Sequence, residues 1–323
     1  MGLKLKIILN KHSKVFIAGH KGMVGSACWR LLKSRGYTNL IGKSSSELDL
    51  RNQADVNTFF ISEKPEVVIN AAAKVGGILA NNEDPYAFLM ENMLIQNNII
   101  KASHEKKIKK LIFLGSSCIY PKYSPQPIKE EYLLSDSLEE TNQWYALAKI
   151  TGVKLCEAIY KKHNKQFISL MPTNLYGTND NYNLKSSHVL PALIRKFHEA
   201  KLNQHTTVNL WGTGNPYREF LYVDDLVSAI LYALENNLND SIYNIGSGSE
   251  ISIRDLATLV QGIIGHKGKI HWDISKPDGT PRKLLDSNKF ESLFQYTKTE
   301  IAEGIKLTYE DFKKNYDHHK RNN

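Results

Sequence analysis

Tyr145 and Lys149 have the residue types and the spacing of a proton-transfer pair. They stand four residues apart in the stretch YALAK (145–149), and on a helix such positions share one face. A tyrosine hydroxyl ordinarily titrates near pH 10, and a cation held beside it lowers that pKa. The pair is therefore a candidate general acid or base for a carbonyl or alcohol oxygen. This spacing also occurs in ordinary amphipathic helices. The surrounding elements must therefore decide whether the pair is a catalytic site or part of such a helix.

The composition is that of a globular protein with a basic surface. The chain has 323 residues, 41% of them hydrophobic, which suits one large or two small domains with a sizeable core. The formal net charge is +9, but basic and acidic residues are interspersed. The densest basic cluster, KKIKK (106–110), stands where we expect a helix to end, and lysines there complement the helix dipole. The charge therefore indicates an anionic small molecule and no nucleic acid.

The three cysteines, Cys28, Cys118 and Cys156, are too far apart to indicate a disulfide framework or a zinc site. We expect no metal. No apolar run approaches the length of a membrane span, so we expect no membrane partner. The first residues hold too short an apolar stretch for a signal peptide. We therefore expect a cytoplasmic protein, with residues 1–13 as a loosely attached lead-in.

A glycine-rich turn near the start predicts dinucleotide binding. Residues 15–18 have the pattern of a buried strand, GHKGMVG (19–25) follows at once, and a helix is expected from 23 to 35, ended by Gly36. In that order the glycines let the backbone approach a diphosphate, and the helix N-terminus supplies amide donors and positive potential.

The next strand, 40–41, predicts which cofactor is preferred. A site for NAD usually has an acidic residue at the end of this strand, for the ribose hydroxyls. Here no acid follows until Glu47, and Lys21 and Lys43 are placed to hold a 2′-phosphate. The sequence therefore favours NADP(H).

Strands and helices then alternate as in an α/β fold with a doubly wound parallel sheet. The carboxyl ends of such strands meet at one edge, where ligands bind, so GSSCIY (115–120) is expected to face the cofactor. The further expected strands of this part are 66–70, 110–114 and 167–171.

Beyond about residue 180 the alternation loosens, which predicts a smaller second domain. Residues 218–223 resemble a strand that leads into a helix capped by an aspartate, and 242–246 indicate a return to the first sheet. We therefore expect a Rossmann domain, 1–180 plus about 219–248, and a C-terminal substrate domain, about 181–218 plus 249–323.

Six long blocks stand out: GHKGMVG (19–25), AAAKVGGILANN (71–82), GSSCIYPK (115–122), MPTNLYG (171–177), SSHVLPALIRKFHEA (186–200) and KPDGTPRKLLD (276–286). Together they resemble the extended short-chain dehydrogenase/reductases that act on nucleotide sugars, and within these the GDP-L-fucose synthases. The resemblance covers nearly the whole chain beyond the lead-in. Ordered blocks of this length are far more specific than single motifs.

The resemblance implies a bifunctional enzyme and assigns residues to both of its reactions. Such an enzyme epimerises GDP-4-keto-6-deoxy-D-mannose at C3 and C5 and then reduces C4 with NADPH, giving GDP-L-fucose. By position, Ser116, Tyr145 and Lys149 take the reductase roles, while Cys118 and His188 match the epimerisation base and acid. The family also suggests a homodimer formed through paired helices.

Binding residues follow from the resemblance in the same way. Three positions depart from the family, because Lys21, Ser45 and Lys196 stand where it has arginines. The changes at 21 and 45 weaken the inference that NADPH is preferred. Lysine at 196 cannot bind phosphate in the bidentate way that an arginine does. The implied substrate contacts are Asn174, Lys196, Trp211, Arg218, Asp278 and Lys283. The implied cofactor contacts are Gly19, His20, Lys21, Gly22, Met23, Val24, Gly25, Lys43, Ser45, Asp49, Leu50, Leu114, Gly115, Ser116, Ser117, Tyr145, Lys149, Pro172, Thr173, Asn174, Leu175 and His188.

The residue types suit this chemistry. A C4 ketone acidifies the hydrogens at C3 and C5, and inversion needs a base on one face and an acid on the other. A thiol titrates near pH 8.5, or lower beside positive charge, so Cys118 is a plausible base; His188 changes charge near neutrality and is a plausible acid. In the reduction, Tyr145 protonates the developing O4 alkoxide, and Ser116 donates a hydrogen bond to it. A free cysteine is otherwise a small buried hydrophobe, as we expect for Cys28 and Cys156.

Three alternatives remain. A nucleotide-sugar 4,6-dehydratase would have Asp-Glu after the strand hydroxyl, where Ser117 and Cys118 stand here. A non-enzymatic redox sensor on this fold would typically lack the Tyr or the Lys. A C4 reductase of a related GDP-4-keto sugar, such as a 6-deoxy-heptose, with little epimerase activity, is not excluded.

Overall fold

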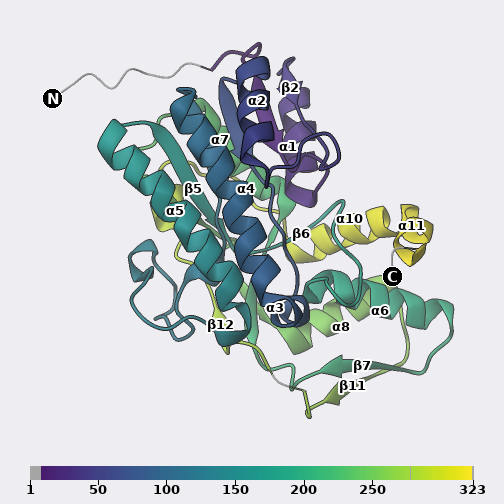
Figure 1. Ribbon diagram of the computed structural model, residues 1–323. Coiled ribbons are helices and arrows are strands. Elements are labelled where there is room, and N and C mark those ends of the chain that lie inside the picture. Colours follow the sequence, from purple (N-terminus) through teal and green to yellow (C-terminus); the bar gives the residue numbers. More distant parts are fainter. Residues whose placement is uncertain (1–8, 277, 322–323) are drawn as a thin grey trace.

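The centre of the protein is a six-stranded parallel sheet (Figure 1). The structure is a computed structural model that describes residues 9–276 and 278–321. The predicted α/β fold class and the predicted strands are confirmed. In spatial order the strands are β2 (Leu40–Ile41), β1 (Val15–Ala18), β3 (Val67–Asn70), β4 (Lys110–Leu114), β5 (Gln166–Pro172) and β9 (Ile242–Ile245).

Helices cover both faces of this sheet, which explains why its strands are buried and mostly apolar. Alternate residues of β1 serve the two faces: Val15 and Ile17 pack in one buried cluster, Phe16 and Ala18 in the other. The first face is covered by α1 (Met23–Ser34) and α7 (Val223–Glu235), and the second by α2 (Gln53–Glu63), α4 (Pro85–Glu105) and α5 (Gln143–His163).

The remaining elements form a smaller assembly with its own apolar cluster. In it β8 (Tyr217–Tyr222) pairs with β10 (Glu250–Ser252), β12 (Arg282–Lys283) and β6 (Asn174–Tyr176), while β7 (Thr207–Trp211) pairs with β11 (Lys269–Asp273). Its helices are α6 (Val189–Leu202), α8 (Ile253–Ile264) and α10 (Ile301–Lys314), followed by α11 (Tyr316–Arg321). The short helices elsewhere are α3 (Ile78–Glu83), α9 (Asn288–Glu291), and the 3₁₀ turns Ser117–Ile119, Glu130–Tyr132 and Glu140–Asn142.

Two details of the chain after residue 216 differ from the sequence pattern. β8 pairs only within the smaller sheet in the described structure, although the expected domain boundary placed residues from 219 with the larger one. The predicted aspartate cap of α7 is wrong, because Tyr222 holds the capping position without a side-chain hydrogen bond. Asp225 instead accepts hydrogen bonds from Thr299 N and Oγ1, at 2.9 and 3.1 Å.

The lead-in is attached where it is described. Lys11 Nζ lies 2.8 Å from Glu235 Oε1 and over the Tyr37 ring, and its carbonyl accepts a hydrogen bond from Thr38 N. The prediction of a loose segment is therefore wrong for residues 9–13, while 1–8 lie outside the described residues. No helix in the described part of the chain is long and apolar enough to cross a membrane.

Candidate active site

The glycine turn between β1 and α1 has the shape of a diphosphate site. Gly19 has φ of +78°, and a Cβ there would lie 2.9 Å from the Ala71 backbone; a Cβ on Gly25 would lie 2.1 Å from Gly19 O. Gly22 precedes α1 and provides no side-chain cap, and the first turn holds no acid. The helix amides are thus left to an anionic ligand, so this turn fits the diphosphate of a dinucleotide.

The glycine turn and the loop after β2 each carry a lysine. Lys21, in the turn, is exposed, and Lys43, in the loop, lies with its Nζ 3.9 Å from Glu47 Oε1; the Lys43 backbone is hydrogen-bonded to His20 of the turn. The Glu47 carboxylate folds back to accept hydrogen bonds from Ser44 N and Oγ, at 2.8 and 2.6 Å. Nearby, Asp49 is held by Arg51 at 2.9 Å. The Glu47 carboxylate is therefore already hydrogen-bonded within the protein and is not free to bind ribose hydroxyls. The lysines favour a ribose that carries a 2′-phosphate.

The carboxyl end of β4 brings Ser116 and Cys118 to Tyr145. Ser116 begins a 3₁₀ turn, and its Oγ accepts a hydrogen bond from Cys118 N at 3.2 Å. Burial, and then the charge of Cys118, raises the pKa of Tyr145, while a hydrogen bond with Ser116 partly offsets this. The three side chains therefore form one cluster, in which Tyr145 is held protonated at neutral pH.

Lys149 points past Tyr145 rather than at its hydroxyl. Its Nζ donates to Leu114 O at 2.8 Å and lies 5.8 Å from the centroid of the Tyr145 ring. Burial lowers the pKa of Lys149 to about 7. The expectation that this lysine lowers the pKa of Tyr145 is therefore wrong, because burial raises that pKa and the ammonium of Lys149 donates to Leu114 O instead.

A Lys149→Met variant will remove a rise of stability with pH. Lys149 titrates near 7 when folded and near 10.4 when unfolded, so between these values the unfolded chain binds more protons. The free energy of unfolding should then increase with pH in this window, by at most about 1.4 kcal/mol per pH unit. Urea unfolding at about pH 7 and about pH 9 measures it.

The matched control for this test is Lys154→Met on the exposed side of the same helix, where Lys154 pairs with Glu157 at 2.8 Å. The control should keep the pH dependence of the unmodified protein. If Lys149→Met also keeps the pH dependence of the unmodified protein, then Lys149 is charged over the whole pH range and the assignment of a lowered pKa to it is wrong.

Cys118 lies among cations contributed by the smaller sheet. Lys283 on β12 and Arg218 on β8 are register partners, and Lys283 Nζ lies 3.8 Å from Cys118 Sγ. Burial alone would raise the pKa of Cys118, but Lys283, hydrogen bonds from Ser116 and Asn142, and then Arg218 bring it below its ordinary value. The thiol is therefore biased toward the thiolate, the form that acts as a base.

His188 comes to the same region from the start of α6. It occupies the capping position of that helix without making a cap, and its side chain is accessible to solvent. Partial desolvation and the charge of Lys283 lower its pKa. Lys283 thus acts on both His188 and Cys118, so the two candidate epimerisation groups share a neighbour.

The other predicted substrate contacts are less tightly grouped. Asp278 attracts Arg218 electrostatically and accepts hydrogen bonds from Thr213 N and Oγ1, at 2.9 and 2.7 Å. Asn174 Nδ2 donates to a backbone carbonyl of β8 at 2.8 Å. The other two predicted substrate contacts, Lys196 and Trp211, touch residues of the smaller assembly in the described structure. Lys196 donates to Asn209 O, and Lys276 Nζ lies 5.6 Å from the centroid of the Trp211 ring.

Two asparagines near the site were missed by sequence reasoning. Asn142 precedes α5 but makes no cap, and hydrogen-bonds the Cys118 sulfur instead. Asn179 Nδ2 donates to Lys21 O at 2.7 Å, behind the glycine turn. Only the position of Asn142, three residues before Tyr145, was a usable signal.

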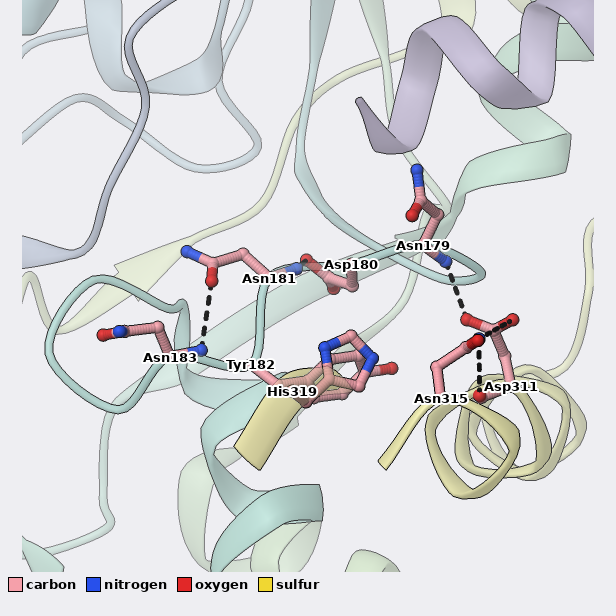
Figure 2. Close-up of a pocket in the computed structure, with 8 residues that line it drawn as sticks. All are labelled: Asn179, Asp180, Asn181, Tyr182, Asn183, Asp311, Asn315 and His319. Carbon is pink, nitrogen blue, oxygen red and sulfur yellow. Dashed lines mark hydrogen bonds between the residues drawn. The ribbon is translucent and has the colours of Figure 1, made fainter. Parts of the chain in front are cut away.

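A cavity of about 440 Å³ beside Asn179 is separate from these groups. Figure 2 shows it between the loop 179–183 and the C-terminal helices, lined mainly by amide side chains and Asp311. None of the predicted catalytic residues lines it, so we do not assign the reaction to it.

Comparisons with known proteins show which family the chain resembles. The family model described as "NAD dependent epimerase/dehydratase family" matches residues 15–246. The chain is 53% identical to GDP-L-fucose synthase 1 of Arabidopsis thaliana over 98% of each chain. It is 46% identical to the GDP-L-fucose synthase of Escherichia coli strain K12, over 94% of this chain and 98% of that protein.

A solved structure extends the comparison to three dimensions. A GDP-mannoheptose C4 reductase from Campylobacter jejuni, with NADP bound, superposes with a TM-score of 0.86 at 39% identity, covering 94% of this chain and 99% of the other. The predicted resemblance is confirmed. The chain belongs to the NAD dependent epimerase/dehydratase family, and its similarity to GDP-L-fucose synthases extends over nearly its whole length.

Proposed function

We propose that this protein converts GDP-4-keto-6-deoxy-D-mannose to GDP-L-fucose, by epimerisation at C3 and C5 followed by reduction of C4 with NADPH. The observation that carries the proposal is the meeting of two sets of groups in one cluster. Cys118, biased toward its thiolate beside Lys283, lies with Ser116 and the protonated Tyr145. The identities of 46–53% to GDP-L-fucose synthases support the substrate.

Epimerisation uses the thiolate first. Cys118 removes the proton from C3 or C5, which the C4 ketone acidifies, and the charge moves to O4 as an enolate. His188, in its protonated form, gives a proton to the same carbon from the opposite face. The proton on Cys118 then passes to solvent and His188 takes up another, so that both groups are ready for the second centre. The hydroxyls of Ser116 and Tyr145 stabilise the O4 charge as it forms, because they are fixed before the reaction.

Reduction of C4 uses Tyr145 as the acid. Bound NADPH supplies the hydride. The raised pKa of Tyr145 keeps its hydroxyl protonated at neutral pH, so it can give that proton to the developing O4 alkoxide. Lys149 would bind the ribose of the cofactor, as the family resemblance implies. The direct test is to supply the GDP-4-keto sugar with NADPH and to determine the stereochemistry of the product at C3, C4 and C5.

NADPH should be used with a higher kcat/KM than NADH, and Lys21→Ala should narrow that difference. The reason is that Lys21 and Lys43 stand by the loop where the 2′-phosphate would lie, while Glu47 is engaged by Ser44. A matched control is Lys33→Ala, which removes a charge from the far end of α1. Equal efficiency with both cofactors in the unmodified enzyme would refute the preference.

A C4 reductase of a related GDP-4-keto heptose is the second candidate. The 39% identity and TM-score of 0.86 to the GDP-mannoheptose C4 reductase support it. Turnover measured on a panel of GDP-4-keto hexoses and heptoses separates the two candidates. Reduction of a heptose without incorporation of solvent hydrogen would favour the second.

The assembly we propose is a homodimer formed through α4 and α5. These helices pack together, yet each also exposes apolar side chains: Met90 and Leu94 are each 39% exposed on α4, as is Leu147 on α5. A second copy would cover this surface. The three free cysteines suit a reducing compartment such as the cytoplasm. The division into a Rossmann domain and a GDP-sugar domain is retained as part of the proposal.

A further inference from the structure

Lys283 is held in place by the backbone around it. Its strand pairs with β8, so that Lys283 stands beside Arg218. The next two residues are fixed as well: Leu284 N donates to Gln126 Oε1 at 2.8 Å, and Leu285 N donates to the buried carboxylate of Glu219 at 3.0 Å. The ammonium that reaches Cys118 therefore extends from an ordered strand rather than a loop.

The charge of Lys283 is not used elsewhere in the described structure. No carboxylate of the described residues forms an ion pair with it, whereas its neighbour Arg282 is bound by Glu250 at 2.8 Å. The other nearby cation, Arg218, is attracted to Asp278 and donates to Tyr217 O at 2.8 Å. At 3.8 Å from the sulfur, the ammonium of Lys283 is thus the cation least committed to other groups.

We propose that Lys283 is a positioning residue for the base: it holds the Cys118 sulfur as a thiolate in the free enzyme, before any sugar binds. The thiol proton goes to solvent, Lys283 keeps its own proton, and the thiolate is ready to accept the proton from C3 or C5. This role rests on the proposed function but is distinct from the sugar contact that the family resemblance implies for Lys283.

Several other groups face the sulfur and set the background for a test. The Ser116 hydroxyl and the Asn142 amide donate to it, Arg218 adds a second positive charge, and Tyr145 stands on its α5 side. His188 shares Lys283 as a neighbour. All of these remain when Lys283 is replaced, so the change measured reports on Lys283.

The chain allows the ionisation of Cys118 to be read directly. Cys28 and Cys156 are fully buried, and burial raises the pKa of each to about 12, so neither reacts in the folded protein. Alkylation by iodoacetamide therefore reports on Cys118. A Cys118→Ser variant gives the blank.

The experiment measures the alkylation rate of the full-length protein from about pH 5 to about pH 10, with no sugar present. Lys283→Met should move the midpoint upward by one unit or more, which slows alkylation about tenfold near pH 7. Lys283→Arg keeps the charge and should stay close to the unmodified protein. Arg282→Met removes a charge from the same strand on the Glu250 side and should leave the midpoint unchanged.

The outcomes separate this inference from the proposed function. An unchanged midpoint in Lys283→Met, with Arg282→Met and circular dichroism normal, overturns the role of Lys283 even if the unmodified enzyme epimerises. If Lys283→Met loses its fold, the arginine variant and the unmodified protein still decide, because a midpoint at the ordinary thiol value in both would contradict a held thiolate. If the unmodified protein shows a lowered alkylation midpoint but does not epimerise the sugar, only the proposed function is contradicted.

Discussion

Tyr145→Phe lowers the rate of NADPH oxidation with the 4-keto sugar by about 10²–10⁴-fold and leaves the affinity for NADPH nearly unchanged. The substitution removes one hydroxyl, which the structure holds protonated beside Ser116 and Cys118. The aromatic ring stays in place, so the packing of α5 against the sheet is kept. Single-turnover absorbance of NADPH measures the rate, and fluorescence titration measures the affinity.

Tyr123→Phe is the matched control, because this tyrosine is 74% exposed and loses the same hydroxyl. It should keep the rate of the unmodified enzyme. Should Tyr145→Phe retain most of its turnover, another group protonates O4 and the role assigned to Tyr145 is wrong.

Cys118→Ser abolishes the exchange of the C3 and C5 hydrogens with deuterated solvent. A serine hydroxyl has a similar shape to the thiol, but Lys283 at this distance cannot bring it into the range of a useful base. Hydride transfer to a 4-keto sugar that is already epimerised should continue, since Ser116, Tyr145 and Lys149 remain. The measurement is mass spectrometry of the recovered sugar, made without NADPH so that reduction does not drain the intermediate.

His188→Asn should separate exchange from inversion. Cys118 still removes the proton, so some deuterium enters, but no acid delivers one to the opposite face. Cys28→Ala is the control for Cys118→Ser, because it removes a thiol of α1 that lies in the core and away from the site. If the unmodified enzyme incorporates no deuterium yet reduces a 4-keto sugar, the protein is a C4 reductase and Cys118 a packing residue.

The local parts of the fold were readable from the sequence because they depend on neighbouring residues. β1, the glycine turn and α1 occupy the predicted positions, and Gly36, with φ of +83°, ends the helix as expected. The pairing of β8 was not readable, because its partners β10, β12 and β6 come from distant parts of the chain and its own apolar residues would suit either sheet.

The site shows the same division between local and distant effects. The residue types of Tyr145, Lys149 and Cys118 were predicted, but the direction of the pKa of Tyr145 depends on burial, which no spacing reveals. The meeting of Cys118 with Lys283 joins residues 165 positions apart. Only the folded sheets bring them together.

Asn179 links the glycine turn to the C-terminal helix α10, which matters for chimeras that exchange C-terminal segments between family members. Its left-handed backbone, with φ of 67°, lets one residue reach two ways: its side chain donates to Lys21 O, and its N–H donates to Asp311 Oδ2 at 2.8 Å. Asn179 thus connects the glycine turn to α10, at the other end of the chain. A chimera that keeps Asn179 but lacks Asp311 loses this connection. We expect such a chimera to bind the cofactor more weakly, although no residue that contacts the cofactor is altered.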